Sequence, residues 1–246
     1  MAKRLLLICG VSTGGKTSSL SGLQNQEKVL YLNAESAKGG NLPFRNKFMK
    51  KVITEPMAEI LGEGGYLNQC KNNPSKVETV VIDSLTFLME MYETRYINTA
   101  ADTRKAWGGY SDFFKNLMNQ SIATIPQNVI LTAHVSDVYN DKDLCTETKI
   151  KLKGSLMNNG IEAYFNDIVS AKRVNIKTLA NYENDLLHIS DEEKELGFKH
   201  VLQTRLTKDT CFERIRSNVD MWKKNETFID CNAQLVLDRL NEYYGE

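Results

Sequence analysis

The chain has 246 residues, of which 41% are hydrophobic and 25% are charged, ordinary proportions for a globular protein. Lysine plus arginine and aspartate plus glutamate both total 31, so the zero net charge excludes a global basic field for polyanions. Any nucleic-acid site must therefore be a local patch. The five cysteines are scattered singly, without C-x-x-C pairs or histidines at metal-ligand spacing, which predicts a reduced cytoplasmic protein without structural zinc.

The N-terminal segment MAKRLLLICG combines basic residues with an apolar run, as a signal peptide does. The run is too short, however, and no small-residue cleavage site follows it. Elsewhere in the sequence no apolar stretch approaches the roughly 20 residues that a membrane helix needs. We therefore expect no membrane partner.

Apolar runs rich in β-branched residues recur along the chain and predict strands buried on both faces of a mostly parallel sheet. They lie at 4–9, 28–33, 77–82, 128–134, 167–174 and 199–206. Aromatic and leucine side chains at helical spacing lie between them and are typical of core-facing helices. The alternation predicts an α/β fold, a doubly wound sheet with helices on both faces, in one domain over 1–246. Two polar segments interrupt it: we expect a loop at 137–153 and an exposed acidic excursion at 181–197.

The first predicted strand leads into Gly10–Thr17 (GVSTGGKT), here called the phosphate loop, which fits G-x-x-x-x-G-K-[ST] at every fixed position. A helical pattern, TSSLSGLQ, follows it. Glycines let successive N–H groups turn toward phosphate oxygens, and a helix N-terminus adds positive potential. We expect Lys16 to reach the β- and γ-phosphates of ATP and the Thr17 hydroxyl to hold Mg²⁺. The predicted cradle consists of Gly10, Ser12, Thr13, Gly14, Gly15, Lys16, Thr17 and Ser18.

Further polar side chains follow predicted strands at the carboxyl edge of the sheet, where open α/β sheets bind ligands. Asp83 ends TVVID and is expected to orient the water shell of the metal. Ser84 either bonds in the site or caps the next helix. Glu35 in YLNAES can act as general base on the attacking water, or be an ordinary helix-start glutamate. His134 ends VILTAH and either senses the γ-phosphate or is a satisfied structural histidine.

With these motifs the chain resembles the RecA-type P-loop ATPase core over roughly residues 4–217. GVSTGGKT is similar to its Walker A loop, VLYLNAES to the strand ending in the catalytic glutamate, and TVVIDSLTFL to its Walker B strand. NVILTAHV is similar to the strand that leads into the second DNA-binding loop. The resemblance is strongest to small single-domain phage ATPases that promote single-strand annealing and recombination, and VLQTRLTKDTCFERIRS is similar to a stretch of that group. It implies an ATP-hydrolysing protein that binds single-stranded DNA.

The resemblance also implies a homo-oligomer, either a ring or a filament, with ATP between subunits. In such assemblies a basic residue of the neighbour contacts the γ-phosphate, because a positive charge supplied in trans stabilises the transferring phosphoryl group. Arg205 and Lys208 of TRLTKDT lie at the corresponding place in the sequence. The alternative is that both form surface ion pairs with Asp209 and Glu213. A single-strand DNA-binding protein is a further candidate partner.

By order along the chain, the resemblance places two DNA-binding loops near 97–109 and 136–155. Basic groups neutralise phosphates and an indole stacks on an unpaired base. The first loop offers Arg104, Lys105 and Trp107. The second offers, at alternate positions that would share one side of an extended chain, Lys149, Lys151 and Lys153. The alternative is that the indole packs and the lysines are simply solvated, because acids dilute the patch.

Other functions share a phosphate loop of this kind. A hexameric helicase or motor would use the same site residues. A small-molecule kinase would need an acceptor pocket and usually an arginine-rich lid, and the sequence shows no clear lid cluster. A nucleotide switch that does not hydrolyse ATP is disfavoured by Glu35.

Overall fold

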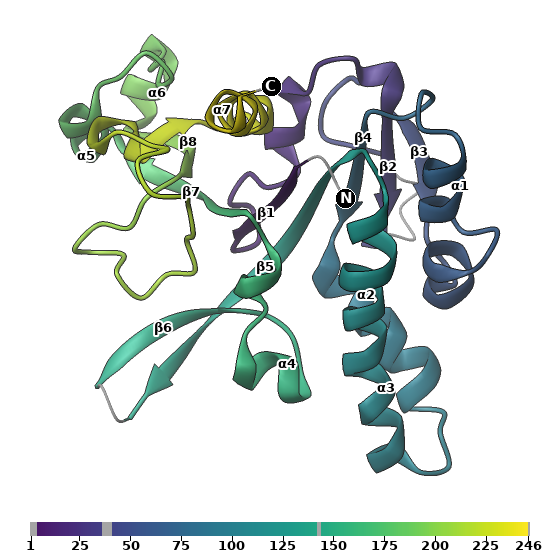
Figure 1. Cartoon of the computed structure of the whole chain (residues 1–246). Coiled ribbons are helices and arrows are strands. Elements are labelled where there is room, and N and C mark those ends of the chain that lie inside the picture. The colour runs from purple at the N-terminus through teal and green to yellow at the C-terminus, as the bar shows by residue number, and fades with distance from the viewer. Residues whose placement is uncertain (1–3, 36–40, 142–143, 246) are drawn as a thin grey trace.

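The computed structural model describes residues 4–35, 41–141 and 144–245, which form a twisted sheet with helices on both faces (Figure 1). Within these residues the nine-stranded sheet has the order β3-β2-β4-β5-β1-β7-β8-β9, and β6 pairs with β5. The strands are β1 (Leu5–Gly10), β2 (Val29–Asn33), β3 (Met49–Val52), β4 (Thr79–Asp83), β5 (Asn128–Asn140), β6 (Cys145–Ile150), β7 (Asp167–Asn175), β8 (Phe198–Gln203) and β9 (Phe228–Asp230). The strands from β3 to β7 in this order are parallel, whereas β6, β8 and β9 pair antiparallel. The predicted mostly parallel α/β sheet is confirmed.

The helices vary in length and many are short. The α-helices are α1 (Tyr66–Asn72), α2 (Leu85–Tyr92), α3 (Thr103–Asn116), α4 (Gly154–Asn159), α5 (Ile176–Leu179), α6 (Asp191–Leu196) and α7 (Ala233–Tyr244). Short 3-10 helices lie at Ser18–Gly22, Gln26–Lys28, Ile122–Thr124, Glu162–Tyr164, Ala180–Tyr182 and Lys224–Thr227, and π-helical turns at Met57–Leu61, Glu93–Ile97 and Leu117–Ser121. Within the described ranges, none of these helices combines the length and the hydropathy that a membrane span requires.

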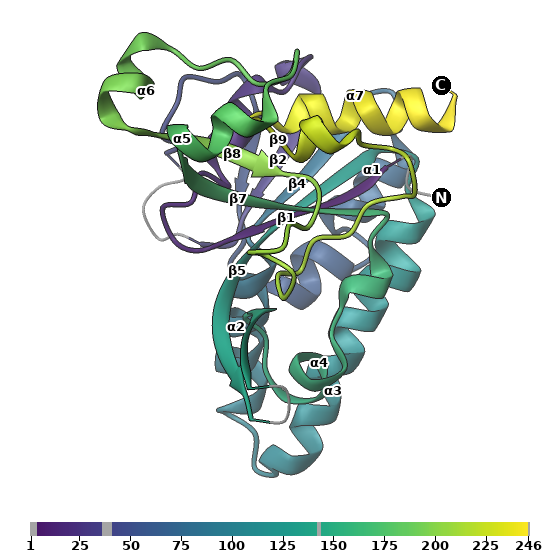
Figure 2. The same cartoon turned by 90° about the vertical axis from the view of Figure 1, so that its left-hand side faces the viewer.

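The sheet separates two hydrophobic cores, because its strands are buried on both faces and successive side chains point to opposite faces. On one face, Leu88 of α2 and Phe114 of α3 share a core with Leu7 of β1. On the other face, Leu237 of α7 shares a core with Leu6. Figure 2 shows α7 on the opposite side of the sheet from α2 and α3. Burying each such side chain stabilises the fold by about 1.5–3 kcal/mol, so β1 and the loop that leaves it are held firmly.

The parallel strands bring distant residues to one edge of the sheet. Strand β5 lies between β1 and β4, and the register pairs Gly10 with His134. The register of β2 and β4 pairs Asn33 with Asp83. The carboxyl ends of β1, β2 and β4 therefore meet beside the middle of β5, where the candidate site lies.

The prediction of a loop at 137–153 is wrong for most of that segment. Strand β5 continues past His134 and pairs with β6, from Val135 opposite Ile150 to Asn140 opposite Cys145. Threonine and isoleucine alternate with charged residues in β6, which favours a strand with period two. We call this two-stranded ribbon the β5–β6 hairpin; its residues 142–143 lie outside the described ranges. Polarity marked the segment as a loop, but a ribbon that leaves the main sheet needs little apolar surface.

The loop predicted at 97–109 is helical in its second half. Helix α3 begins at Thr103 and is capped by Asp102, whose side chain accepts a hydrogen bond from the Lys105 N–H at 3.2 Å. The aromatic stripe of this helix anchors it to the core, with Tyr110 buried. The amphipathic pattern therefore extends further toward the N-terminus than the glycines of this segment suggested.

The helical pattern after the phosphate loop yields only a five-residue 3-10 helix, Ser18–Gly22. The Ser19 hydroxyl donates to the Lys16 carbonyl at 2.6 Å, a local bond that competes with regular helix formation. The Asn232 side chain fills the space beside Gly22, where a Cβ would lie 2.1 Å from its Oδ1. The positive potential expected from a long helix is therefore limited to one short turn.

The acidic excursion at 181–197 joins β7 to β8 and lies at the periphery of the molecule (Figure 1). Its helix α6 starts with a capping box between Ser190 and Glu193. The excursion is fastened to the strand β9, because the His188 N–H and the Leu186 carbonyl both bond to Asp230. The strand that follows the excursion ends at Gln203, earlier than the predicted boundary at 206.

Candidate nucleotide site

The phosphate loop leaves β1 and turns closely over β7. A Cβ on Gly10 would lie 2.3 Å from the Ala171 carbonyl oxygen, and a Cβ on Gly14 would lie 2.6 Å from it, so a side chain fits at neither position. Gly15 has a φ of +105° and Thr13 a φ of +64°. Glycine adopts such angles freely, whereas a β-branched threonine is strained there. The motif predicts the glycines and gives no sign of the strain at Thr13.

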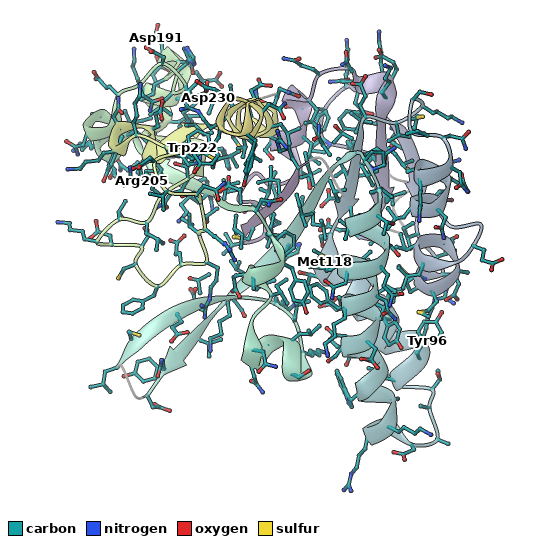
Figure 3. The ribbon with its side chains drawn as sticks, in the orientation of Figure 1. Tyr96, Met118, Asp191, Arg205, Trp222 and Asp230 are labelled. Carbon is teal, nitrogen blue, oxygen red and sulfur yellow. The ribbon has the colours of Figure 1, made fainter. Side chains whose placement is uncertain are left out.

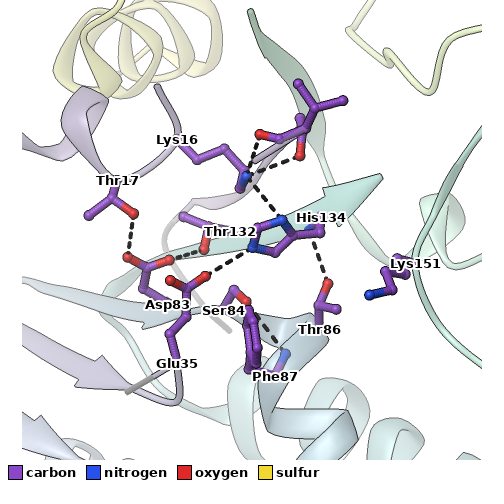
Figure 4. Close-up of polar contacts among 12 residues, drawn as sticks. Lys16, Thr17, Glu35, Asp83, Ser84, Thr86, Phe87, Thr132, His134 and Lys151 are labelled. Atoms are coloured by element: carbon purple, nitrogen blue, oxygen red, sulfur yellow. Dashed lines mark hydrogen bonds and ion pairs between the residues drawn. The ribbon is translucent and has the colours of Figure 1, made fainter. Parts of the chain in front are cut away.

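Lys16 folds back into the loop that carries it (Figure 4). Its Nζ donates to the carbonyl oxygens of Gly10 at 3.0 Å and Val11 at 2.9 Å, and lies 3.5 Å from Nδ1 of His134. The residue is 6% exposed, and burial lowers its pKa although nearby carboxylates act in the opposite direction. A buried ammonium held by neutral carbonyls gains strongly from an anionic phosphate beside it.

Asp83 is fully buried at the end of β4 and accepts hydrogen bonds from hydroxyl groups. Thr17 Oγ1 donates to its Oδ2 at 2.8 Å, the Tyr31 hydroxyl donates to the same oxygen at 2.7 Å, and the Thr132 hydroxyl donates to Oδ1. Burial raises the pKa of Asp83, and the hydroxyl bonds offset part of that increase. Tyr31 and Thr132 were missing from the predicted site. The sequence signal that could have identified them is a polar group within an otherwise apolar strand, Tyr31 in VLYLN and Thr132 in NVILTAH.

Thr17 and Asp83 fit a magnesium ion. A hydroxyl and a carboxylate are the hard oxygen ligands that Mg²⁺ prefers, and this ion usually keeps several waters and shares its remaining positions with substrate phosphates. In the part of the chain that the structure describes, no cluster of three or more His, Cys, Asp or Glu side chains could hold a metal alone. The donor set thus suits an ion shared with a triphosphate.

Glu35 and His134 face each other across β4 (Figure 4). Oε1 of Glu35 lies 3.0 Å from Nε2 of His134, and this hydrogen bond lowers the pKa of Glu35 in spite of the burial that acts against it. The backbone N–H of His134 donates to the Thr86 hydroxyl at 2.9 Å. The Phe87 ring packs edge to face against the imidazole, with ring centroids 5.4 Å apart. Glu35 is therefore ionised at neutral pH, and the imidazole connects it with Lys16.

A pocket opens at this edge of the sheet and brings most of the predicted residues together. It is lined by the phosphate loop, by Glu35 and His134, and by two residues outside the predicted site, His200 and Cys231. His200 lies in β8 and Cys231 directly follows β9. Neither belongs to a motif, so the sequence carried no signal for them. The pocket can bind a triphosphate along the loop and present its end to Glu35.

Arg205 and Lys208 do not line this pocket. Strand β8 runs antiparallel to β7, so the chain that leaves it moves away from the carboxyl edge. Nη1 of Arg205 donates to the Trp222 carbonyl at 2.7 Å, and both residues are labelled in Figure 3. Among the described residues, neither Arg205 nor Lys208 forms the surface ion pair with Asp209 or Glu213 that was considered as an alternative, and Glu213 pairs with Lys172.

The residues predicted for the first DNA loop lie on α3. Arg104 and Lys105 are exposed on its first turn. Trp107 is half-buried, with its ring centroid 5.2 Å from that of Tyr110. A Cβ on Gly154 would lie 3.5 Å from the indole. The indole therefore packs, as the alternative interpretation expected, and the basic pair alone faces solvent.

The lysines predicted for the second DNA loop are paired with glutamates. The pairs are Lys149 with Glu147 at 3.6 Å, Lys151 with Glu90 at 3.5 Å and Lys153 with Glu93 at 2.7 Å. The expectation that the three lysines share one side of an extended chain is wrong, because β6 ends at Ile150 and the Leu152 N–H turns back to the Ile150 carbonyl at 2.9 Å. Exposed pairs of this kind contribute about 0–1 kcal/mol, so a phosphate can displace the glutamates.

A comparison of the sequence with known families covers most residues of this site. A sequence profile described as an AAA domain, AAA_24, matches residues 2–175, a range that holds the phosphate loop, Glu35, Asp83 and His134 but neither His200 nor Cys231. No curated protein sequence matches the chain. Among solved structures the chain is similar to a KaiC-like protein from the hyperthermophilic archaeon Pyrococcus horikoshii OT3, with a TM-score of 0.42 and 12% identity over 86% of this chain and 83% of that chain.

The predicted fold class is confirmed as an α/β P-loop fold with a mostly parallel sheet. The narrower likeness to phage annealing ATPases stays a prediction. Because the profile spans well over half of the sequence and includes the whole phosphate site, the chain belongs to the AAA domain family AAA_24 and is a P-loop NTPase.

Proposed function

We propose that the protein is a Mg²⁺-dependent ATPase that binds single-stranded DNA and promotes annealing or homologous recombination. The observation that carries the proposal is the continuity of β5. Thr132 of this strand bonds to Asp83. His134, two residues further on, bonds to Glu35, and the strand then continues into the β5–β6 hairpin. A strand that touches the catalytic carboxylates and also forms an exposed ribbon can couple the state of the nucleotide to a DNA-binding surface.

Hydrolysis needs a group that activates water, and Glu35 is the candidate. Its carboxylate lines the same pocket as Lys16, and the hydrogen bond to His134 orients it and keeps its pKa low. A carboxylate in this position takes the proton of a water that attacks the γ-phosphorus. Bound Mg²⁺ would neutralise charge on the phosphate oxygens, with Thr17 and Asp83 holding it. His134, between Glu35 and Lys16, is placed to respond to the presence of the γ-phosphate.

A second cation is expected from a neighbouring subunit. Of the described residues that line the pocket, Lys16 is the only lysine or arginine. Phosphoryl transfer commonly uses a further positive charge that stabilises the transition state. Arg205 and Lys208 are exposed and lie off their own chain's pocket, which suits a role in trans within a homo-oligomer.

Other functions of a P-loop protein make different predictions. The contact between Glu35 and His134 favours hydrolysis over a switch that only binds nucleotide. A helicase-type motor would share these residues and would be recognised by sustained unwinding of a duplex. A small-molecule kinase would transfer labelled phosphate from ATP to an acceptor such as a nucleoside.

The test is the steady-state rate of ATP hydrolysis with and without single-stranded DNA. Lys16→Ala serves as the control for contaminating ATPases. We expect DNA to raise the rate several-fold and the variant to lose both the basal and the stimulated rate. DNA affinity should also fall steeply as salt increases, since phosphate contacts release counterions. A rate that DNA leaves unchanged, or binding insensitive to salt, would contradict the coupling.

A further inference from the structure

We propose that His200 is a positioning residue for the phosphate loop and thereby sets the affinity for ATP. His200 lies outside the residues that match the family profile, which end at 175. Its Nε2 lies 3.2 Å from the carbonyl oxygen of Thr13, the strained residue of the loop. The proposal goes beyond the DNA-coupled function, because it concerns nucleotide binding by the single chain.

The sheet register explains how β8 reaches the loop. The phosphate loop crosses β7 at Ala171, whose carbonyl leaves no room for a Cβ on Gly10 or Gly14. Strand β8 pairs with β7 on the outer side, and His200 lies opposite Arg173, two residues beyond Ala171. Side chains two residues apart on a strand share a face, so His200 stands beside the part of the loop that has passed over β7.

The contact with Thr13 fixes the orientation of a peptide group. The Thr13 carbonyl and the Gly14 N–H belong to one planar trans peptide and point in opposite directions. With the carbonyl held by His200, the Gly14 N–H donates to the Val11 carbonyl at 3.1 Å and closes the first turn of the loop. Because Thr13 has a φ of +64°, the isolated loop would favour other conformations. An outside donor therefore raises the fraction of loops that are ready to bind, and apparent affinity scales with that fraction.

A second contact from the same side acts on the other end of the glycine-rich turn. Cys231 Sγ donates to the Gly15 carbonyl at 3.4 Å, and the Ser19 N–H donates to the same oxygen at 2.8 Å. Burial raises the pKa of Cys231 to about 12, so the sulfur stays a thiol. Holding this carbonyl outward turns the Lys16 N–H toward the inside of the loop, where a phosphate oxygen can accept from it. The strands β8 and β9 thus form an outer support for the loop, and His200 contributes its directional bond.

The experiment compares His200→Gln with His200→Met in the full-length chain. Both substitutes are unbranched and of similar length, but only glutamine carries an N–H donor that can replace Nε2 of the imidazole. Equilibrium binding of ATP with Mg²⁺ is measured without DNA, and kcat is measured separately. His188→Gln is the matched control, since His188 is exposed on the acidic excursion, does not line the pocket, and bonds through Nδ1 to Asp230, a bond that the glutamine amide can replace.

We expect His200→Met to raise the Kd for ATP by about five- to tenfold, the loss typical of one hydrogen bond, while kcat at saturating ATP changes less than about twofold. His200→Gln and His188→Gln should both bind within about twofold of the parent chain. Equal Kd values for the glutamine and methionine variants would overturn the proposal. This holds whether both values equal that of the parent chain or both are raised by a general loss of stability. So would a loss confined to kcat. Because DNA is absent, a failure here is separate from a failure of DNA coupling.

Discussion

The carboxyl edge of the sheet and the β5–β6 hairpin share one strand but handle charge in different ways. At the edge, Asp83 is fully buried and three hydroxyl groups donate to it. On and beside the hairpin, lysines such as Lys151 and Lys153 are exposed and pair with glutamates. A buried group left without its partner costs about 1–3 kcal/mol, whereas an exposed pair contributes about 0–1 kcal/mol. The fold therefore fixes the geometry of the edge, while the hairpin keeps charges that a ligand can rearrange.

The largest expected effect concerns the carboxyl edge of the sheet, whose geometry the fold fixes. Glu35→Gln keeps the shape of the side chain but removes the base, so we expect kcat for ATP hydrolysis to fall by about 10²–10⁴-fold with little change in ATP binding. Because the hydrogen bond from His134 lowers the pKa of Glu35, the carboxylate persists below its ordinary value of 4.5. The part of the pH dependence that Glu35 determines should therefore be a fall in the rate of ATP hydrolysis below pH 4.5.

Steady-state kinetics and direct ATP binding, measured on the same preparations, check this expectation. Glu63→Gln is the control, because Glu63 is an exposed glutamate outside the pocket. A Glu35→Gln variant that hydrolyses ATP at the parent rate would remove Glu35 from the mechanism.

A second prediction extends the comparison to a buried carboxyl without donors. Asp167 begins β7 at the opposite edge, and within the described residues neither of its oxygens has a hydrogen-bond partner. Burial raises its pKa from 3.8 to about 8, so between these values the folded chain holds a proton that the unfolded chain has lost. Stability from this group is complete below the lower value and declines as pH rises through about 8. We expect the free energy of unfolding to fall by about 2–4 kcal/mol from pH 5 to pH 8 for this reason.

Urea unfolding across this pH range, in the parent chain and in Asp167→Asn, measures that decline. The asparagine variant cannot ionise, so its stability should vary less and should approach or exceed that of the parent at pH 8. Asp185→Asn, at an exposed aspartate, controls for the change in net charge. Parallel curves for the parent and the Asp167 variant would show that Asp167 does not bind the extra proton.

The difference between the carboxyl edge and the hairpin also explains which parts of the fold and the site could be predicted from the sequence. Gly10, Lys16 and Asp83 were predictable because a motif defines a backbone shape and parallel strands end at one edge. Thr132 was hidden inside an apolar run, and only the register of β4 and β5 brings its hydroxyl to Asp83. His200 meets the loop across 187 residues of sequence, through the pairing of β7 with β8, which no local pattern encodes. The hairpin was missed because its charges suggested a loop, whereas Glu147 is paired both with Lys149 of the same strand and with Arg214, which lies far along the chain.

The smallest expected effect concerns the exposed ion pairs beside the β5–β6 hairpin. Replacing Glu90 and Glu93 by glutamine frees Lys151 and Lys153 from their ion pairs without altering the lysines. If the hairpin region binds single-stranded DNA, the freed ammonium groups no longer have to exchange a glutamate for a phosphate. We expect affinity for a single-stranded oligonucleotide to rise by about two- to fivefold at low salt, with a steeper salt dependence.

Fluorescence anisotropy titrations at several salt concentrations measure this change, and the control must release a lysine elsewhere. Glu78→Gln does so, because Glu78 pairs with Lys28 at the start of β4, far along that strand from the hairpin. A nonspecific effect of net charge would also raise the affinity in this variant, by about half as much in free energy because one carboxylate is removed instead of two. An increase confined to the Glu90 and Glu93 variant places the phosphates near the hairpin. An affinity that stays the same or falls would mean that these lysines serve only the glutamates they already contact, and the DNA surface would have to lie elsewhere.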